Sequence, residues 1–292
     1  MAASVPPTGC CGVPSAAPGV PPGAAMWDAM KGWYTEKMSP ATASLAHELY
    51  NQLGLFDGEK KVRVLETHCG DTVAAGRLLP LEAVESYTAC DFSPAMVEAA
   101  GKRLGERAQT VLAQSVELPF GDAAFDCYMS NLGCCCVSDL GTKLKEARRV
   151  LAPGGRAAMS MRIADLEGDT AFRLVAETLK PFGLPPGPDR EGLRLGKDLP
   201  ALKAKVLEAG FSQVRAWRTW ITVPLRAGDP GSAGGGSPFV EWATSQGQVA
   251  KFLASLDEGA RQQALEALKA AGEAPSEQGA LYVAVAVAVA SV

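Results

Sequence analysis

The fold is decided by the stretch Val62-Arg63-Val64-Leu65-Glu66-Thr67-His68-Cys69-Gly70-Asp71-Thr72. Its first residues form a short β-branched and apolar run, which is typical of a buried parallel strand. The run ends on the carboxylate of Glu66, passes through a tight segment at Gly70 and enters an apolar run that predicts a helix over 72–79. Such a turn exposes backbone N–H groups, and the carboxylate can accept from a ligand amine or hydroxyl, so the stretch predicts a site for a polar small molecule.

A second acid strengthens this interpretation. Asp91 closes another strand-like run, 86–90, about 20 residues beyond the glycine turn. An acid in that place can take both hydroxyls of a ribose. A dinucleotide site would need G-x-G-x-x-G, whereas the corresponding positions here are His68, Gly70 and Val73. Two of the three glycines are missing, which disfavours an NAD- or FAD-dependent oxidoreductase.

Four motifs in this order resemble class I S-adenosylmethionine-dependent methyltransferases, and within them the small-molecule enzymes of the ubiquinone-biosynthesis type. Residues 66–72 resemble the family's E/D-x-G-x-G-x-G loop, and Cys90-Asp91-Phe92-Ser93-Pro94-Ala95-Met96 resembles its strand-two acid and following helix. Residues 114–126 resemble its D-A-x-x-L-P-F…F-D segment, and Arg148-Arg149-Val150-Leu151-Ala152-Pro153-Gly154-Gly155 is similar to its R-V-L-K-P-G-G turn. Together they are far more specific than any one alone.

The resemblance implies an S-adenosylmethionine cofactor and a set of residues that bind it. Glu66 would fix the amino group of the methionine moiety, Gly70 would let the chain pass close to the ligand, and Asp91 would take the ribose hydroxyls. Further positions of the implied site are Phe92 beside the adenine, Gln114 and Ser115 at its edge, His68 in the loop and Ser130 at a strand end. The sequence identifies no catalytic base and no metal ligands.

Three residues depart from the family pattern. His68 and Thr72 stand where the family has glycines, and a Cβ there costs on the order of 1 kcal/mol if φ must be positive. The imidazole could fill the methionine pocket, act as a base, or be a tolerated substitution, and we favour the last. Gln114 stands where the family usually has an Asp that accepts from the adenine amine. A catalytically inactive methyltransferase-like subunit, binding or structural, is therefore the alternative function.

The order of elements predicts an α/β fold. Strands are expected at 62–66, 85–90, 108–114, 124–130 and 155–161, and helices at 72–79, 94–104, 139–151 and 198–209. This alternation requires a Rossmann-like, doubly wound sheet that is mostly parallel, with helices on both faces. The Val/Ala run 281–292 is expected as a final antiparallel strand beside 213–223, and Glu66, Asp91, Gln114 and Ser130 fall at strand carboxyl ends, where ligands bind.

The remaining segments decorate this domain of residues 26–292. Residues 1–25, rich in Pro, Gly and Ala, cannot bury a core and predict an arm that is either a floppy tail or a docking device for a protein partner. Residues 26–57 predict an N-terminal helical cap. Further expected segments are a rim insertion at 162–197, a Gly-rich loop at 226–238 and a helical addition at 239–271, with helices at about 239–254 and 257–271.

Candidate substrate contacts lie in two places. In the cap, Trp27, Trp33 and Tyr34 have helical spacing, and the resemblance places this segment over the cofactor as a lid. They could stack on substrate or sulfonium, or simply pack on the core, and Tyr34 is the preferred contact. After the fourth strand, Cys134, Cys135 and Cys136 could face substrate, as a thiophile such as arsenite would require, or be small buried residues, which is the favoured interpretation.

Composition and charge exclude several classes. The 292 residues carry a formal charge of −4 and 47% hydrophobic residues, which offers no electrostatic case for nucleic acid or an anionic membrane. The start of the chain lacks the features of a secretion signal or a mitochondrial leader, so a cytoplasmic location is expected. Eight cysteines then predict free thiols in a reducing compartment. The expected partner is a small-molecule acceptor.

Overall fold

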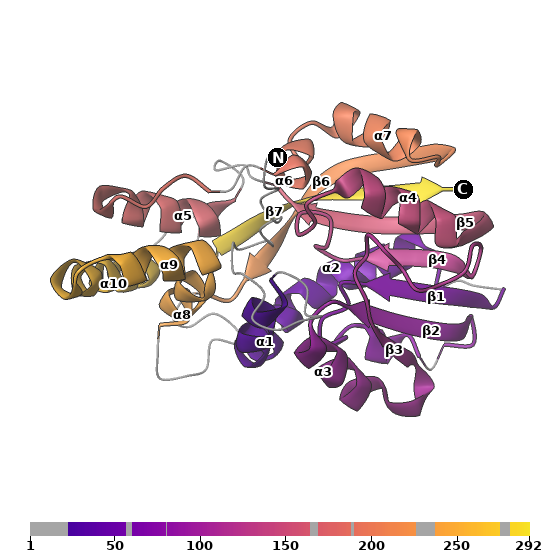
Figure 1. Cartoon of the computed structure of the whole chain (residues 1–292), viewed down its shortest axis with the longest axis horizontal. Coiled ribbons are helices and arrows are strands. Elements are labelled where there is room, and N and C mark those ends of the chain that lie inside the picture. Colours follow the sequence, from indigo (N-terminus) through magenta and orange to yellow (C-terminus); the bar gives the residue numbers. More distant parts are fainter. Residues whose placement is uncertain are drawn as a thin grey trace, which may run out of the picture.

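The computed structural model describes residues 23–56, 60–79, 81–163, 169–187, 190–225, 237–274 and 281–292. Its centre is a seven-stranded sheet in the order β3-β2-β1-β4-β5-β7-β6 (Figure 1). The strands are β1 (Val62–Thr67), β2 (Val84–Asp91), β3 (Gln109–Leu112), β4 (Phe125–Ser130), β5 (Leu151–Arg162), β6 (Gln213–Val223) and β7 (Leu281–Ser291). All neighbours pair in parallel except β7, which is antiparallel to both β5 and β6. The predicted fold class is confirmed.

The strand order brings the polar strand ends to one edge. Chain connections run outward from β1 to β2 and β3 on one side, and from β4 to β5 on the other, so the direction of winding reverses between β1 and β4. The register pairs Thr67 with Cys90 and Glu66 with Met129. The carboxyl ends of β1, β2 and β4 therefore lie side by side at the switch point, where open α/β sheets bind ligands.

The N-terminal segment forms the expected cap as three consecutive helical pieces. They are α1 (Ala24–Trp33), a π-helical turn η1 (Tyr34–Met38) and α2 (Ser39–Gln52). The two helices that the sequence predicts are thus joined by one wider turn instead of a loop. Leu45, Leu49 and Tyr50 of α2 are buried in the core, while α1 packs against the helix that follows β2.

The predicted helix over 72–79 is wrong. The chain there makes only the 3₁₀ turn η2 (Ala75–Arg77), with i→i+3 hydrogen bonds from Ala75 N to Thr72 O and from Leu78 N to Ala75 O. Thr72 has a φ of 56°, so its backbone is left-handed and cannot begin an α-helix. The apolar run that suggested a helix is buried as a compact turn instead, with Ala75 and Leu78 fully inaccessible.

The other predicted helices agree with the sequence pattern to within a few residues. The described helices after η2 are α3 (Pro94–Leu104), α4 (Leu140–Val150), α5 (Thr170–Leu179), α6 (Glu191–Leu195), α7 (Leu199–Glu208), α8 (Pro238–Ser245), α9 (Gly247–Ser255) and α10 (Glu258–Glu273), with 3₁₀ turns η3 (Gly105–Arg107) and η4 (Lys180–Phe182). Of these, α5 and α6, which lie within the expected rim insertion at 162–197, were not predicted. The single helix predicted at 239–254 is two helices that break at Gln246, which has an extended backbone. Helices α5, α8, α9 and α10 gather beyond one end of the sheet (Figure 1).

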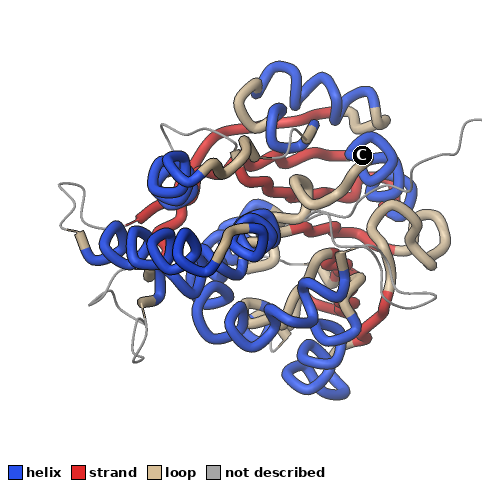
Figure 2. The backbone as a smooth tube through the Cα atoms, turned by 60° about the vertical axis from the view of Figure 1, so that its left-hand side comes forward, coloured by secondary structure: helices blue, strands red, loops and turns tan. Residues whose placement is uncertain are grey.

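Strand β7 shows how the two faces of the sheet are filled. Its valines, Val283 to Val289 at every second position, belong to the core cluster that contains α2, α5, α8 and α10. The intervening alanines, Ala284 to Ala290, belong to the cluster that contains α4 and α7. Helices therefore cover both faces, as Figure 2 shows. Large side chains fill one layer, and small ones let the helices of the other layer approach closely.

Two expected segments fall largely outside the described residues. These are the arm at 1–25, of which 23–25 are described, and the Gly-rich loop at 226–238, of which 237–238 are described. Among the described helices, none combines the length and apolarity needed to cross a membrane.

Candidate functional site

The loop after β1 adopts a glycine-type conformation with two side chains in it. His68, Gly70 and Thr72 have φ values of 55°, 54° and 56°. Both non-glycine residues thus sit in the left-handed region, at the two positions where the family has glycine, and each carries the strain that a Cβ causes there. His68 and Thr72 thus place an imidazole and a hydroxyl in a left-handed loop.

Asp91 ties this loop to the next helix. One carboxylate oxygen accepts from the backbone N–H of Gly70, at 3.0 Å, and the other from that of Ser93, also at 3.0 Å. The side chain is buried, and burial raises the pKa of the carboxyl group, while the backbone donors and the nearby Lys143 oppose that rise. Asp91 therefore lies between the β1 turn and the start of α3, with lone pairs left for further donors.

The N-terminal cap is fastened to the same place. Asp28 of α1 accepts from Ser93 Oγ at 2.6 Å and from the backbone N–H of Ala95 at 3.1 Å, in the first turn of α3. Ser39 of α2 donates to Asp71, whose other oxygen pairs with Arg103 at 3.2 Å. Two carboxylates thus hold the cap: Asp28 binds the start of α3, and Asp71 in the glycine turn binds Ser39.

Glu66 differs from Asp91 in its hydrogen-bond partners, which are tyrosine hydroxyls instead of backbone N–H groups. It lies at the end of β1, is 4% exposed, and accepts hydrogen bonds from the hydroxyls of Tyr50 and Tyr87. Burial raises its pKa to about 8, against the effect of the Tyr50 hydrogen bond. At neutral pH the protonated form therefore prevails, and Glu66 can both donate and accept.

His68 turns toward a buried lysine. Lys143 of α4 lies with its Nζ 3.0 Å from His68 Nδ1 and 2.8 Å from Ser130 Oγ, and it donates more weakly to Ser115 Oγ at 3.5 Å. Gly133 makes room for this cluster, because a Cβ there would overlap Ser130 Oγ and lie 2.7 Å from His68 Cγ. Burial, with the charge of Lys143, lowers the pKa of His68, and burial lowers that of Lys143.

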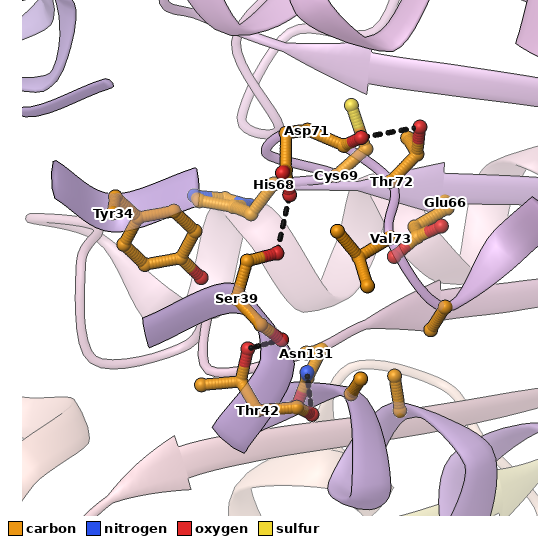
Figure 3. A pocket seen from close by; sticks show the side chains of 13 residues that line it. Tyr34, Ser39, Thr42, Glu66, His68, Cys69, Asp71, Thr72, Val73 and Asn131 are labelled. Carbon is orange, nitrogen blue, oxygen red and sulfur yellow. Dashed lines mark hydrogen bonds between the residues drawn. The ribbon is translucent and has the colours of Figure 1, made fainter. Parts of the chain in front are cut away.

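A small cavity adjoins these groups. Its volume is about 30 Å³, enough for a water-sized molecule. It is lined by residues of the cap, the β1 turn and the loop after β4: Tyr34, Ser39, Thr42, Ala43, Ala46, Glu66, His68, Cys69, Asp71, Thr72, Val73, Ala74 and Asn131. Figure 3 shows Ser39 of the cap directed at Asp71 of the β1 turn, while the Thr42 hydroxyl donates back to the carbonyl of Ser39. The ring of Tyr34 covers Gly70, where an added Cβ would lie 3.5 Å from its Cε1.

The structure brings together most of the residues that the sequence selected. Glu66, His68 and Tyr34 line the cavity, and Asp91 contacts Gly70. Phe92 lies with its ring 6.3 Å from that of His68, and Ser115 and Ser130 meet Lys143. Gln114 is exposed and makes an isolated bridge with Glu117, and Trp33 packs against the core.

The cysteine run does not line this cavity. Cys134 and Cys135 are buried in the core cluster around α4, as the favoured interpretation expects. A hydrogen bond with Cys136, aided by the backbone N–H and charge of Arg162, lowers the pKa of Cys135 to about 6. No group of His, Cys, Asp and Glu side chains within the described ranges is arranged to hold a metal ion.

Several residues of the site carry no family motif, and sequence reasoning missed them. Ser39, Thr42, Asp71 and Asn131 line the cavity. Lys143 had a detectable signal, because it shares the stripe of Leu140, Leu144, Ala147 and Val150 that α4 buries. A lysine on an apolar helical stripe is rarely buried without a polar partner, so its position alone indicates a cluster.

Comparison with known proteins agrees with the motifs. Residues 65–159 match the family model described as a methyltransferase domain. Over 109 residues the chain is 36% identical to a demethylmenaquinone methyltransferase of Corynebacterium glutamicum, which covers 37% of this chain and 44% of that protein. Over 143 residues it is 32% identical to the Streptomyces griseus protein of the same name, covering 44% and 60%. The chain thus matches about half the length of these relatives.

A solved structure extends the likeness to the whole fold. The YcgJ protein of Bacillus subtilis superposes with a TM-score of 0.51 at 18% identity, over 83% of this chain and 98% of that one. At this identity the likeness concerns the fold alone. The strand order and the glycine-type turn agree with this similarity, and residues 65–159 are the part of the chain that matches a methyltransferase domain.

Proposed function

We propose that this protein transfers the methyl group of S-adenosylmethionine to a small-molecule acceptor. The observation that carries the proposal is the position of Asp91 and Glu66 at the carboxyl ends of neighbouring strands, with the left-handed turn at Gly70 between them. Acids at these two strand ends suit the hydroxyl and amino groups of an adenosyl amino acid. The match of residues 65–159 to a methyltransferase family supports the same activity.

The polar residues at the strand ends fit the functional groups of the cofactor, but the cavity between them must widen before the cofactor can bind. Asp91 keeps lone pairs for ribose hydroxyls, Glu66 faces the cavity for the amino group, and Phe92 and Ser115 would flank the base. The present cavity of about 30 Å³ is well below the roughly 300–1,000 Å³ of ordinary ligand pockets. Tyr34 and the cap therefore have to move away from Gly70 before a nucleoside enters, and their return excludes water.

The protein's part in the reaction is then mainly positional. S-adenosylmethionine supplies an electrophilic methyl group that is already activated. The acids at the strand ends orient the adenosyl group, the closed cap holds the acceptor against it, and the buried sheet edge keeps bulk water away. The names of the curated relatives, demethylmenaquinone methyltransferases, support a quinone-type ring as the acceptor.

Calorimetric binding of S-adenosylhomocysteine tests this proposal. We expect saturable one-to-one binding, and about a 100-fold weaker affinity for Asp91→Asn, because a charged acceptor for two hydroxyls is lost. Glu82→Gln, which removes an exposed carboxylate near the start of β2, should bind like the wild type. Absence of binding by a folded wild-type protein would sink the proposal.

A second candidate is a methyltransferase-like subunit without catalysis. It is favoured by the contact of Tyr34 with Gly70 and by the His68–Lys143–Ser130 cluster, which together leave only the small cavity. This function predicts that S-adenosylhomocysteine gives no thermal shift. The enzyme should gain about 2.7 kcal/mol of stability at a hundredfold excess of ligand over Kd.

A further inference from the structure

Lys143 is an interior lysine whose surroundings do not explain it. Its side chain has no exposed surface. In the described part of the chain, the hydrogen-bond partners of its Nζ are a histidine nitrogen and two serine hydroxyls, not a carboxylate. Burying an ammonium group that no carboxylate hydrogen-bonds is costly, so such a lysine gives up its proton readily.

The contacts of Lys143 suit both protonation states. As a neutral amine it donates to Ser130 Oγ and Ser115 Oγ, and its lone pair accepts from His68 Nδ1–H. In that state His68 Nε2 carries no proton and is a free base. As an ammonium, Lys143 donates to the same three atoms, and the proton of His68 is on Nε2. The proton can therefore move along the pair without any heavy atom moving far.

We infer that His68 and Lys143 form a proton-relay pair that takes the proton of an acidic hydroxyl, a phenol or an enol, on the acceptor. The inference rests on the proposed function, whose substrate class it narrows. The acceptor O–H bond breaks, its proton goes to His68 Nε2, and its electron pair stays on the acceptor as an anion. The Nδ1 proton passes to Lys143 as the Nε2–H bond forms, and the anion is then the nucleophile for the methyl group.

The position of His68 at the cavity and the charges around Lys143 agree with the roles of base and proton acceptor. His68 is half-buried and lines the cavity, so it is the catalytic residue, while Lys143 acts through it as a positioning residue. After the transfer, a buried ammonium faces an anion, which favours the ionised acceptor. The groups that face the pair are the carboxylate of Asp91 and the thiols of Cys90, Cys134, Cys135 and Cys136, on β2 and the loop after β4.

The tautomer of His68 tests the relay without any turnover. The chain has two histidines, so a ¹⁵N-histidine spectrum contains His68 and His47 alone. We expect His68 as the Nδ1–H tautomer in the wild type and in Lys145→Met, which removes an exposed lysine of the same helix. Lys143→Met should convert it to the Nε2–H form with His47 unchanged. An Nε2–H tautomer in the wild type would overturn the inference.

A coloured phenol tests the base itself. At a pH where free 4-nitrophenol is mostly protonated, the wild type and Lys145→Met should increase the visible absorption of its anion. His68→Gly should not, and it should still fold, because its φ of 55° suits glycine. Unchanged ionisation by His68→Gly, or none by the wild type, contradicts the relay. Binding of S-adenosylhomocysteine without ionisation contradicts the relay alone, and ionisation without that binding contradicts the proposed function alone.

Discussion

The two halves of the sheet use their strands differently. In the half made of β3, β2, β1 and β4, three of the four strands carry a polar side chain at or next to their carboxyl ends. These side chains, Glu66, Asp91 and Ser130, are buried and hydrogen-bonded. In the half made of β5, β7 and β6, strand β7 alternates valine and alanine and is buried nearly throughout. The first half therefore carries the polar residues of the candidate site at its edge, whereas the second half mainly contributes buried apolar side chains to the core.

This contrast shows where the protein tolerates unfavourable groups. The described residues include four left-handed non-glycine residues, His68, Thr72, Ala123 and Leu132, and all four lie in loops next to the strands of the first half. The glutamate of raised pKa and the interior lysine lie in or beside the same half. Each costs free energy locally, and such costs persist where function needs them. The regular packing of β7 between helical layers offsets them. Disturbing the first half should therefore change ligand binding and pH response, and disturbing the second should change stability alone.

The largest expected effect is on the pH dependence of stability, through Glu66. Its pKa rises from the ordinary 4.5 to about 8 on folding, so the folded state binds the proton more tightly. This contribution to stability is complete below pH 4.5 and is lost as the pH rises toward 8, by on the order of a few kcal/mol. Glu66→Gln, which cannot ionise, should flatten this fall in urea denaturation at pH 5–8.

Glu82→Gln is the control for that measurement, because it removes an exposed carboxylate at the start of the neighbouring strand. Its stability should follow the wild-type dependence on pH. A wild-type stability that does not fall over this range would contradict the position of Glu66 as a buried, protonated acid.

The next effect separates the halves directly. Val287→Ala removes two methyl groups from a fully buried site in β7 and should lower the free energy of unfolding by about 2 kcal/mol. Thr222→Ala on the exposed side of β6 should change it by less than about 0.5 kcal/mol. Guanidinium denaturation measures both. The affinity for S-adenosylhomocysteine should not change in either variant, and a loss in Val287→Ala would show that the halves are coupled.

The smallest effect concerns the strained turn. Thr72→Gly and Thr72→Ala remove the same hydroxyl, but glycine alone accepts a φ of 56° without strain. We expect the glycine variant to be about 1 kcal/mol more stable than the alanine variant. Thermal unfolding of the pair measures this difference. Equal stabilities would mean that the turn relaxes out of the left-handed region when the side chain is removed.

The sequence predicts β6 and β7 nearly to the residue, whereas β5 begins four residues before the predicted start at 155. The strand expected at 213–223 is β6, and it pairs antiparallel with β7 as expected. Period-two alternation is a local signal, and here no ligand or strain competes with it. The predicted helix 72–79 is wrong because its first residue, Thr72, has a left-handed backbone, and helix propensity does not report backbone strain. Strain is absent from local sequence patterns.

The residues of the site that belong to a sequence motif could be predicted, whereas the contacts that depend on how helices pack against the sheet could not. Glu66, Gly70 and Asp91 follow from strand ends and a turn, whose positions topology fixes. The partnership of His68 with Lys143 spans 75 residues and depends on how α4 packs under β4, which no spacing reveals. The raised pKa of Glu66 likewise depends on burial, at a place where Tyr50 and Tyr87, distant from it in the sequence, meet around it.

The contact of Asp28 with α3 links the position of the cap to the stability of that helix. Because this α1 carboxylate accepts from Ala95 N–H, the first turn of α3 is completed by a residue more than sixty positions earlier in the chain. Whenever the cap lifts to admit a ligand, that amide loses its partner and the turn becomes free to fray. The rate of amide hydrogen exchange at Ala95 would then report how often the cap opens to admit or release a ligand.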